Sequence, residues 1–119
     1  MQTRDINQIV SPDAAARLLA FRHAVSVALP GAVHDVVLFG SRARGDARPD
    51  SDYDVAVLLA DDLAEDRSVR SRLADVAWEH VVEGNIIQAI ALPIDAFSGS
   101  SATRDELSTR IAAEGISVR

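Results

Sequence analysis

Two short apolar runs separated by a polar stretch constrain the fold of this chain most. The first run is residues 36–39 and the second is residues 55–60, and residues 41–51 between them are rich in Arg, Asp, Gly and Pro. Apolar runs of this length, with β-branched residues and turn residues at their ends, are typical of buried strands. About a dozen connecting residues suit antiparallel neighbours. The sequence therefore predicts two antiparallel strands joined by a polar loop.

Helical patterns surround these two strands. Ser11, Pro12 and Asp13 have the order of an N-cap, a first-turn proline and a first-turn acid, which predicts a helix reaching about residue 29. A second long helix is predicted over residues 62–83, ended by Gly84. Residues 86–92 form a third strand, and residues 103–106 open a last helix.

The order of these elements indicates an α/β (α+β) fold, a small mixed β-sheet with helices packed on it. A long helical crossover joins the second and third strands, so these two should be parallel. The antiparallel first pair should place Gly40 and Ser41 at the same sheet edge as Asp52. The 119 residues fit a single domain over residues 1–119.

Composition excludes several classes of function. No apolar run is long enough to cross a bilayer, and the absence of cysteine excludes disulfides and thiolate metal sites and fits a cytoplasmic protein. The net charge of −6 argues against broad adhesion to nucleic acid, and an aromatic content of 4% leaves few side chains on which the bases of an RNA could stack. Because the chain has no cysteine, any metal must be held by oxygen or imidazole.

Asp52 and Asp54 are the centre of the candidate site. Residues two apart on a strand point to the same face, so both carboxylates converge while Tyr53 points away. Two carboxylates on one face repel each other, and a hard divalent cation relieves that repulsion. Mg²⁺ is typically held by one or two carboxylates together with substrate phosphates. The pair therefore predicts a site for Mg²⁺ or Mn²⁺.

The loop before these acids suits a triphosphate. Gly40 lets the backbone approach a ligand closely, and Ser41 offers a hydroxyl and an exposed N–H group. If residues 41–45 form one helical turn, its N-terminus points at the phosphates. Arg42, Arg44 and Arg48 supply guanidinium groups, one or two of which could neutralise charge on the leaving pyrophosphate. A plain hairpin loop with solvated charges is the competing interpretation.

The run GSRARGDARPDSDYD, residues 40–54, resembles the signature of the polymerase-beta-type nucleotidyltransferase superfamily. It is closest to the minimal nucleotidyltransferases, which often pair with a helical HEPN protein in toxin–antitoxin systems. The resemblance implies that Gly40 and Ser41 hold the phosphates of ATP and that Asp52 and Asp54 hold the metals. It also implies transfer of AMP to a hydroxyl of a protein or small molecule, with a HEPN-like partner or a second copy of the chain completing the acceptor site.

One part of that signature is missing. The family usually supplies a third carboxylate from the middle of the next strand, and Gln88 stands at that place. A glutamine can offer an oxygen to a metal but supplies no negative charge and cannot act as a base. Glu79, Glu83 and Asp95 are the candidate substitutes. The alternative hypothesis is therefore a catalytically weakened nucleotide-binding module that acts as a protein-binding, antitoxin-like partner.

Two aromatic residues of the second long helix are expected to serve packing rather than chemistry. His80 falls on the apolar stripe of that helix, which favours a position in the core or at its boundary. Trp78 lies next to the stripe, and we expect it to close the core rather than to mark a partner surface.

Overall fold

The computed structural model describes residues 4–97 and 105–119. Its helices are η1 (Ile6–Gln8), α1 (Pro12–Ala28), α2 (Ser41–Arg44), α3 (Asp61–Ala64), α4 (Arg67–Trp78), η2 (Ile94–Phe97) and α5 (Glu106–Glu114). Its strands are β1 (Val33–Phe39), β2 (Tyr53–Leu59), β3 (Val81–Val82), β4 (Asn85–Pro93) and β5 (Ile116–Ser117). The predicted α/β class is confirmed.

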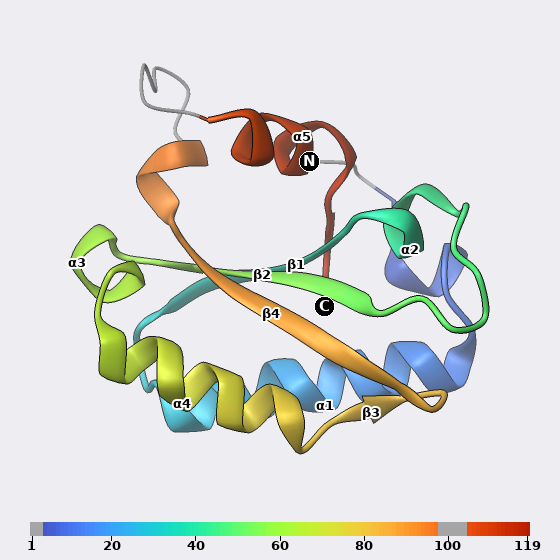
Figure 1. Cartoon of the computed structure of the whole chain (residues 1–119), viewed down its shortest axis with the longest axis horizontal. Helices are drawn as coiled ribbons and strands as arrows, with labels where there is room; N and C mark the ends of the chain where they lie inside the picture. Colours follow the sequence, from blue (N-terminus) through green and yellow to red (C-terminus); the bar gives the residue numbers. More distant parts are fainter. Residues whose placement is uncertain (1–3, 98–104) are drawn as a thin grey trace.

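The strands form one mixed sheet in the order β3-β4-β2-β1-β5 (Figure 1). β1 and β2 are antiparallel, with Phe39 opposite Asp54, and β2 and β4 are parallel, with Asp54 opposite Gln88. Both predicted strand pairings are therefore confirmed. The register brings the end of β1, the start of β2 and the first half of β4 to the same edge of the sheet.

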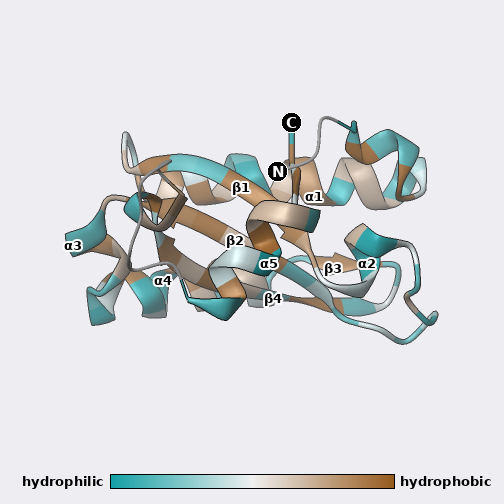
Figure 2. Cartoon of the chain, turned by 90° about the horizontal axis from the view of Figure 1, so that it is seen from above, coloured by the Kyte–Doolittle hydropathy of each residue, from teal (hydrophilic) through white to brown (hydrophobic). Residues whose placement is uncertain are grey.

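Helices cover both faces of the sheet. α1 and α4 lie along one face, and α5 lies across the other (Figure 1). Alternate residues of β2 divide between these layers: Tyr53 and Val55 join the large core beneath α1 and α4, whereas Ala56 packs with Ile111 of α5. In Figure 2 the hydropathy colouring is accordingly brown along the central strands, and α5 lies above them. Asp54 has the parity of Ala56, so it faces the α5 side.

The first helix begins as predicted. The Ser11 hydroxyl caps α1 by accepting a hydrogen bond from the Ala14 N–H at 3.1 Å, and Pro12 occupies the first helical position. α1 ends at Ala28, one residue before the predicted end. Its buried face carries Leu18, Phe21 and Val25 into the large core.

The prediction of one long helix over residues 62–83 was wrong. Two helices, α3 and α4, occupy this stretch because Asp66 adopts an extended backbone and caps α4, accepting hydrogen bonds from the N–H groups of Ser68 and Val69. α4 then ends at Trp78, whose side chain is 75% exposed, so the expectation that it closes the core was also wrong. His80 does lie at the core boundary, with its ring edge-on to Phe21 at 5.7 Å.

A tight hairpin replaces the predicted end of that helix. β3 and β4 pair antiparallel, with Val82 opposite Asn85, and only Glu83 and Gly84 connect them. Both linking residues have positive φ, 51° and 81°, as a two-residue type I′ turn requires. A glutamate is uncommon in this conformation, which is why the sequence did not indicate the hairpin.

The C-terminal part of the chain also adds a strand that was not predicted. α5 begins at Glu106 with Asp105 as its N-cap, and the predicted first residues of this helix, 103 and 104, lie outside the described residues. β5 follows and pairs antiparallel with β1. Within the two described segments, no helix combines the length and apolarity needed to cross a membrane.

Candidate active site

Gly40 places its backbone directly against a carboxylate. It follows β1 with φ 75° and ψ −156°, a conformation that is essentially restricted to glycine, and it is the N-cap of the single turn α2. A Cβ atom at this position would lie 2.6 Å from Asp54 Oδ2. The predicted need for a glycine at position 40 therefore has a local cause, since only a missing side chain allows this approach.

Asp52 and Asp54 lie together, as predicted. The pKa of Asp54 is raised, first because burial disfavours its charged form and second because the negative charge of Asp52 is near; the positive charge of Arg44 opposes both effects. A carboxylate in this setting gains from a cation, which offsets both the burial and the repulsion. Two carboxylates fit Mg²⁺ or Mn²⁺ that arrives with substrate phosphates, rather than a site built from protein ligands alone.

Gln88 occupies the place of the third acid. It lies opposite Asp54 in the register of β4 and β2, and its Nε2 donates a hydrogen bond of 2.8 Å to Asp52 Oδ2. Its amide therefore satisfies one oxygen of the pair without adding charge.

None of the three candidate substitutes joins the acid pair. Glu83 accepts a hydrogen bond from the Tyr53 hydroxyl, Glu79 caps the end of α4, and Asp95 lies in η2. Throughout residues 4–97 and 105–119, no three His, Asp or Glu side chains come together as a metal-binding group. Two carboxylates and a glutamine are thus what the described residues present to a metal at this site.

The two arginines of α2 have different places. Arg42 donates to the Ser51 carbonyl from Nη2 at 2.8 Å, and its guanidinium lies 4.3 Å from the ring centroid of Tyr53. It therefore holds the loop on the face of β2 opposite to Asp54. Arg44 lies near the acids, since its charge acts on Asp54. Its Nε pairs with Asp46 at 3.2 Å and its Nη1 with Glu114 at 3.1 Å.

Ser41 and Arg48 complete the loop. Ser41 is half-buried at the first position of α2, and its carbonyl accepts hydrogen bonds from the N–H groups of Gly45 and Asp46. Arg48 is exposed, and its backbone N–H donates to the Ser51 hydroxyl. The structure thus brings Gly40, Asp52, Asp54 and Arg44 together, and it turns Arg42 away to support the loop.

Glu114 is a site residue that the sequence did not indicate. Its Oε1 accepts hydrogen bonds from the Gly40 N–H at 3.2 Å and from Arg44 Nη1 at 3.1 Å. The two ends of the first bond are 74 residues apart in the chain. No local motif could reveal this contact, because it depends on where α5 crosses the sheet.

A hollow of about 180 Å³ lies behind the loop, on the side away from the acids. Arg42, Tyr53 and Glu83 are among the residues that line it. The Tyr53 hydroxyl donates to Glu83 Oε1 at 2.9 Å, so the only tyrosine of the chain connects β2 to the hairpin turn.

The hydroxyl of Tyr53 should ionise at an unusually high pH. Burial and the hydrogen bond to Glu83 raise its pKa to about 12, with Arg42 acting in the opposite direction. Because the folded state holds this proton more tightly than the unfolded state, the free energy of unfolding should fall as the pH rises from about 10 to about 12. Ultraviolet absorbance measures the transition for a single tyrosine, with circular dichroism recording whether the fold persists.

Glu83→Gln is the matched variant for this titration. It removes the negative charge beside the hydroxyl, so the pKa of Tyr53 should move down toward its ordinary value. An absorbance midpoint near pH 10 in wild-type protein that is still folded would contradict the environment described for Tyr53.

Comparisons with known proteins agree with this geometry. A family model described as a nucleotidyltransferase domain matches residues 20–111. Among solved structures, the chain is similar to a protein from Sulfolobus solfataricus described as a candidate nucleotidyltransferase. That alignment has 17% identity and a TM-score of 0.59, and it covers 98% of this chain and 87% of the other.

A second similar structure is a chain from a toxin–antitoxin complex crystallised with AMP-PNP. It has 20% identity and a TM-score of 0.55, and the alignment covers 85% of this chain and 72% of that chain. At these identities both structures show a shared fold. No curated protein sequence matches this chain.

Proposed function

The chain belongs to the nucleotidyltransferase domain family, and from this premise we propose that it transfers AMP from ATP to a hydroxyl of a protein or small molecule. The observation that carries the proposal is the contact between the Gly40 backbone and Asp54, a carboxylate whose pKa is raised by burial and by Asp52. An ordinary turn requires neither a glycine against an acid nor two acids on one face.

Each residue of the site has a proposed role. Asp52 and Asp54 hold Mg²⁺ or Mn²⁺, which when bound neutralises phosphate charge and activates the α-phosphate. Gly40 and Ser41 hold the phosphates through backbone N–H groups and the Ser41 hydroxyl, and Arg44 neutralises charge on the departing pyrophosphate. The acceptor hydroxyl attacks the α-phosphorus, the bond to pyrophosphate breaks, and the hydroxyl proton passes to water. Positioning and electrostatic stabilisation supply most of the catalysis in reactions of this kind.

A protein partner is part of the proposal. Trp78, Val81 and Ile86, from the end of α4 and the β3–β4 hairpin, have exposed fractions of 75%, 47% and 39%. Large exposed apolar side chains, and tryptophan above all, are common in protein interfaces. The similar chain from a toxin–antitoxin complex supports a toxin as that partner, and we propose a helical, HEPN-like one. It would complete the acceptor site or be the acceptor itself.

One observation favours a second candidate function. Gln88 offers Asp52 an amide where the family usually provides a third carboxylate, so the site lacks that carboxylate as a base for the proton of the acceptor hydroxyl. A protein of this kind would bind nucleotide and metal and act as an antitoxin-like partner without transferring AMP. Its complex with the partner should survive the Asp54→Asn substitution. Co-purification of the variant with the partner measures this.

Replacing Gln88 with Asp separates these two functions. The new carboxylate adds the charge that Gln88 lacks, so transfer in the presence of Mg²⁺ should rise by about tenfold. Gln88→Ala is the control, because it removes the hydrogen bond to Asp52 without adding charge. Equal transfer by the two variants would show that the charge at position 88 does not limit the reaction.

The proposed reaction is tested with ATP radiolabelled at the α-phosphate. The protein is incubated with host lysate and Mg²⁺ or Mn²⁺, and labelled proteins are resolved by mass. Label that appears with the wild type and disappears with Asp54→Asn supports AMP transfer and identifies the acceptor. An absence of label, together with metal-dependent ATP binding in calorimetry, would favour the binding module.

A further inference from the structure

A carboxylate of the protein already lies where the proposed function needs phosphate oxygens. One oxygen of Glu114 accepts from both the Gly40 N–H and Arg44 Nη1, at 3.2 Å and 3.1 Å. The Glu114 side chain is only 15% exposed, so the contact is well shielded from water. The same two donors are those assigned above to the triphosphate.

We propose that Glu114 is an internal anionic latch that competes with nucleotide for Gly40 and Arg44. This inference rests on the proposed function and adds a residue that sets nucleotide affinity. In the free protein the carboxylate occupies both the Gly40 N–H and Arg44 Nη1. A triphosphate must displace it before its own oxygens can reach the same donors.

The charges around Glu114 give the latch its effect. Arg44 attracts the carboxylate, but it is shared with Asp46, and Asp54 lies on the other side of Gly40. An incoming triphosphate therefore meets the charge of Glu114 in addition to the acid pair, with Arg44 as the nearby positive charge. Because like charges at close range disfavour each other, removing the charge of Glu114, which holds no metal, should strengthen nucleotide binding.

The chain fixes the position from which Glu114 reaches the loop. Glu114 is the last residue of α5, and a Cβ at the next residue, Gly115, would lie 2.6 Å from Val37 Cγ1. β5 then pairs with β1, and the Val118 N–H donates to the Val36 carbonyl at 2.7 Å. The end of α5 is thus pressed against β1 at Val37, three residues before Gly40.

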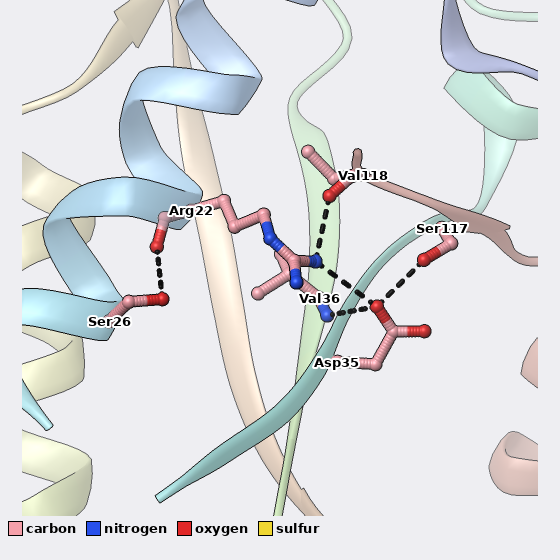
Figure 3. A network of polar contacts seen from close by, with 6 residues as sticks. All are labelled: Arg22, Ser26, Asp35, Val36, Ser117 and Val118. Atoms are coloured by element: carbon pink, nitrogen blue, oxygen red, sulfur yellow. Dashed lines mark hydrogen bonds and ion pairs between the residues drawn. The ribbon is translucent and has the colours of Figure 1, made fainter. Parts of the chain in front are cut away.

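A polar network holds this tail in place (Figure 3). Asp35 Oδ1 accepts from the Ser117 hydroxyl at 2.7 Å and from Arg22 Nη1 at 3.2 Å. The same Arg22 nitrogen donates to the Val118 carbonyl at 2.9 Å, so α1, β1 and the tail share one set of contacts. With the backbone anchored on both sides, release of the latch requires only rotation of the Glu114 side chain.

Glu114→Gln tests the latch. The amide oxygen can still accept from the Gly40 N–H, so the loop keeps its support while the negative charge is lost. Calorimetric titration with ATP and Mg²⁺ should show about tenfold tighter binding than wild type. Glu106→Gln is the matched control, since it removes the same charge from the first turn of α5, where Glu106 pairs only with Arg110 among the described residues. Its affinity should equal that of the wild type.

The outcomes separate the latch from the function on which it depends. If the wild type binds ATP and Glu114→Gln binds it equally well or more weakly, the latch is overturned. Glu114 would then be a positioning residue for Gly40 and Arg44. Binding by none of the proteins would overturn the proposed nucleotide site together with the latch. Circular dichroism of each variant checks the fold, and Glu114→Ala, which should also bind ATP more tightly, repeats the test if the glutamine variant does not fold.

Discussion

Replacing Asp54 with Asn should lower AMP transfer by at least about a hundredfold, since the metal loses a charged ligand at the reacting phosphates. The same change should leave the protein at least as stable as the wild type at neutral pH. Asp54 has a raised pKa because burial and Asp52 disfavour its charge, so the ionised carboxylate destabilises the folded state. Label transfer and thermal unfolding measure the two effects on one preparation.

The pH dependence of this stability difference has a definite sign. The folded state binds the proton of Asp54 more tightly than the unfolded state does, because its pKa is raised above 3.8. The ionised carboxylate therefore destabilises the folded state at neutral pH, and this destabilisation is relieved as the pH falls through the raised pKa. The gain in the free energy of unfolding from Asp54→Asn should be greatest at neutral pH and should become smaller in acid.

Asp50→Asn is the matched control for Asp54→Asn. Asp50 is exposed in the same loop, and its substitution should change neither transfer nor stability appreciably. Asp52→Asn should lower transfer to a similar extent. Transfer that survives substitution of both Asp52 and Asp54 would show that the metal and the reaction lie elsewhere.

Gly40→Ala should be the most destabilising single change in the loop. Its backbone lies in a region that side chains strain to adopt, and the new Cβ would meet Asp54 Oδ2 at 2.6 Å. Strain and overpacking together should lower the free energy of unfolding by about 2–4 kcal/mol. Transfer should also fall sharply, because Asp54 has to move away. Denaturant unfolding measures the first effect.

Gly31→Ala is the control for Gly40→Ala. Gly31 also has a positive φ, 71°, but a Cβ there would meet nothing within 4 Å. It should cost only the backbone strain, about 1 kcal/mol, and leave transfer unchanged. Equal destabilisation by the two substitutions would mean that the contact between Gly40 and Asp54 is not tight in solution.

The acid pair and the glycine before it could be predicted because they depend on local order. Residues that are two apart on a strand point to the same face of the sheet. A short antiparallel connection also returns Asp54 to the end of β1, where Gly40 lies. The parallel pairing of β2 with β4 then placed Gln88 beside the acids, as the crossover length implied. These features require only strand periodicity and the length of two connections.

The features that were missed depend on contacts that periodicity does not encode. Asp66 divided a continuous helical pattern because its side chain caps a new helix, and the β3–β4 hairpin depended on a glutamate at positive φ. β5 has only two residues and forms because β1 offers a free edge. Glu114 and the support given by Arg42 follow from tertiary packing and from stacking on Tyr53.

The most direct test of the site is a crystal structure with AMP-PNP and Mn²⁺, whose anomalous scattering locates the metal independently. The account predicts metal density between Asp52 and Asp54, triphosphate oxygens on the N–H groups of Gly40 and Ser41, and Glu114 turned away from Gly40. Nucleotide bound elsewhere, such as in the hollow beside Tyr53 and Glu83, with no metal at the acid pair, would contradict it.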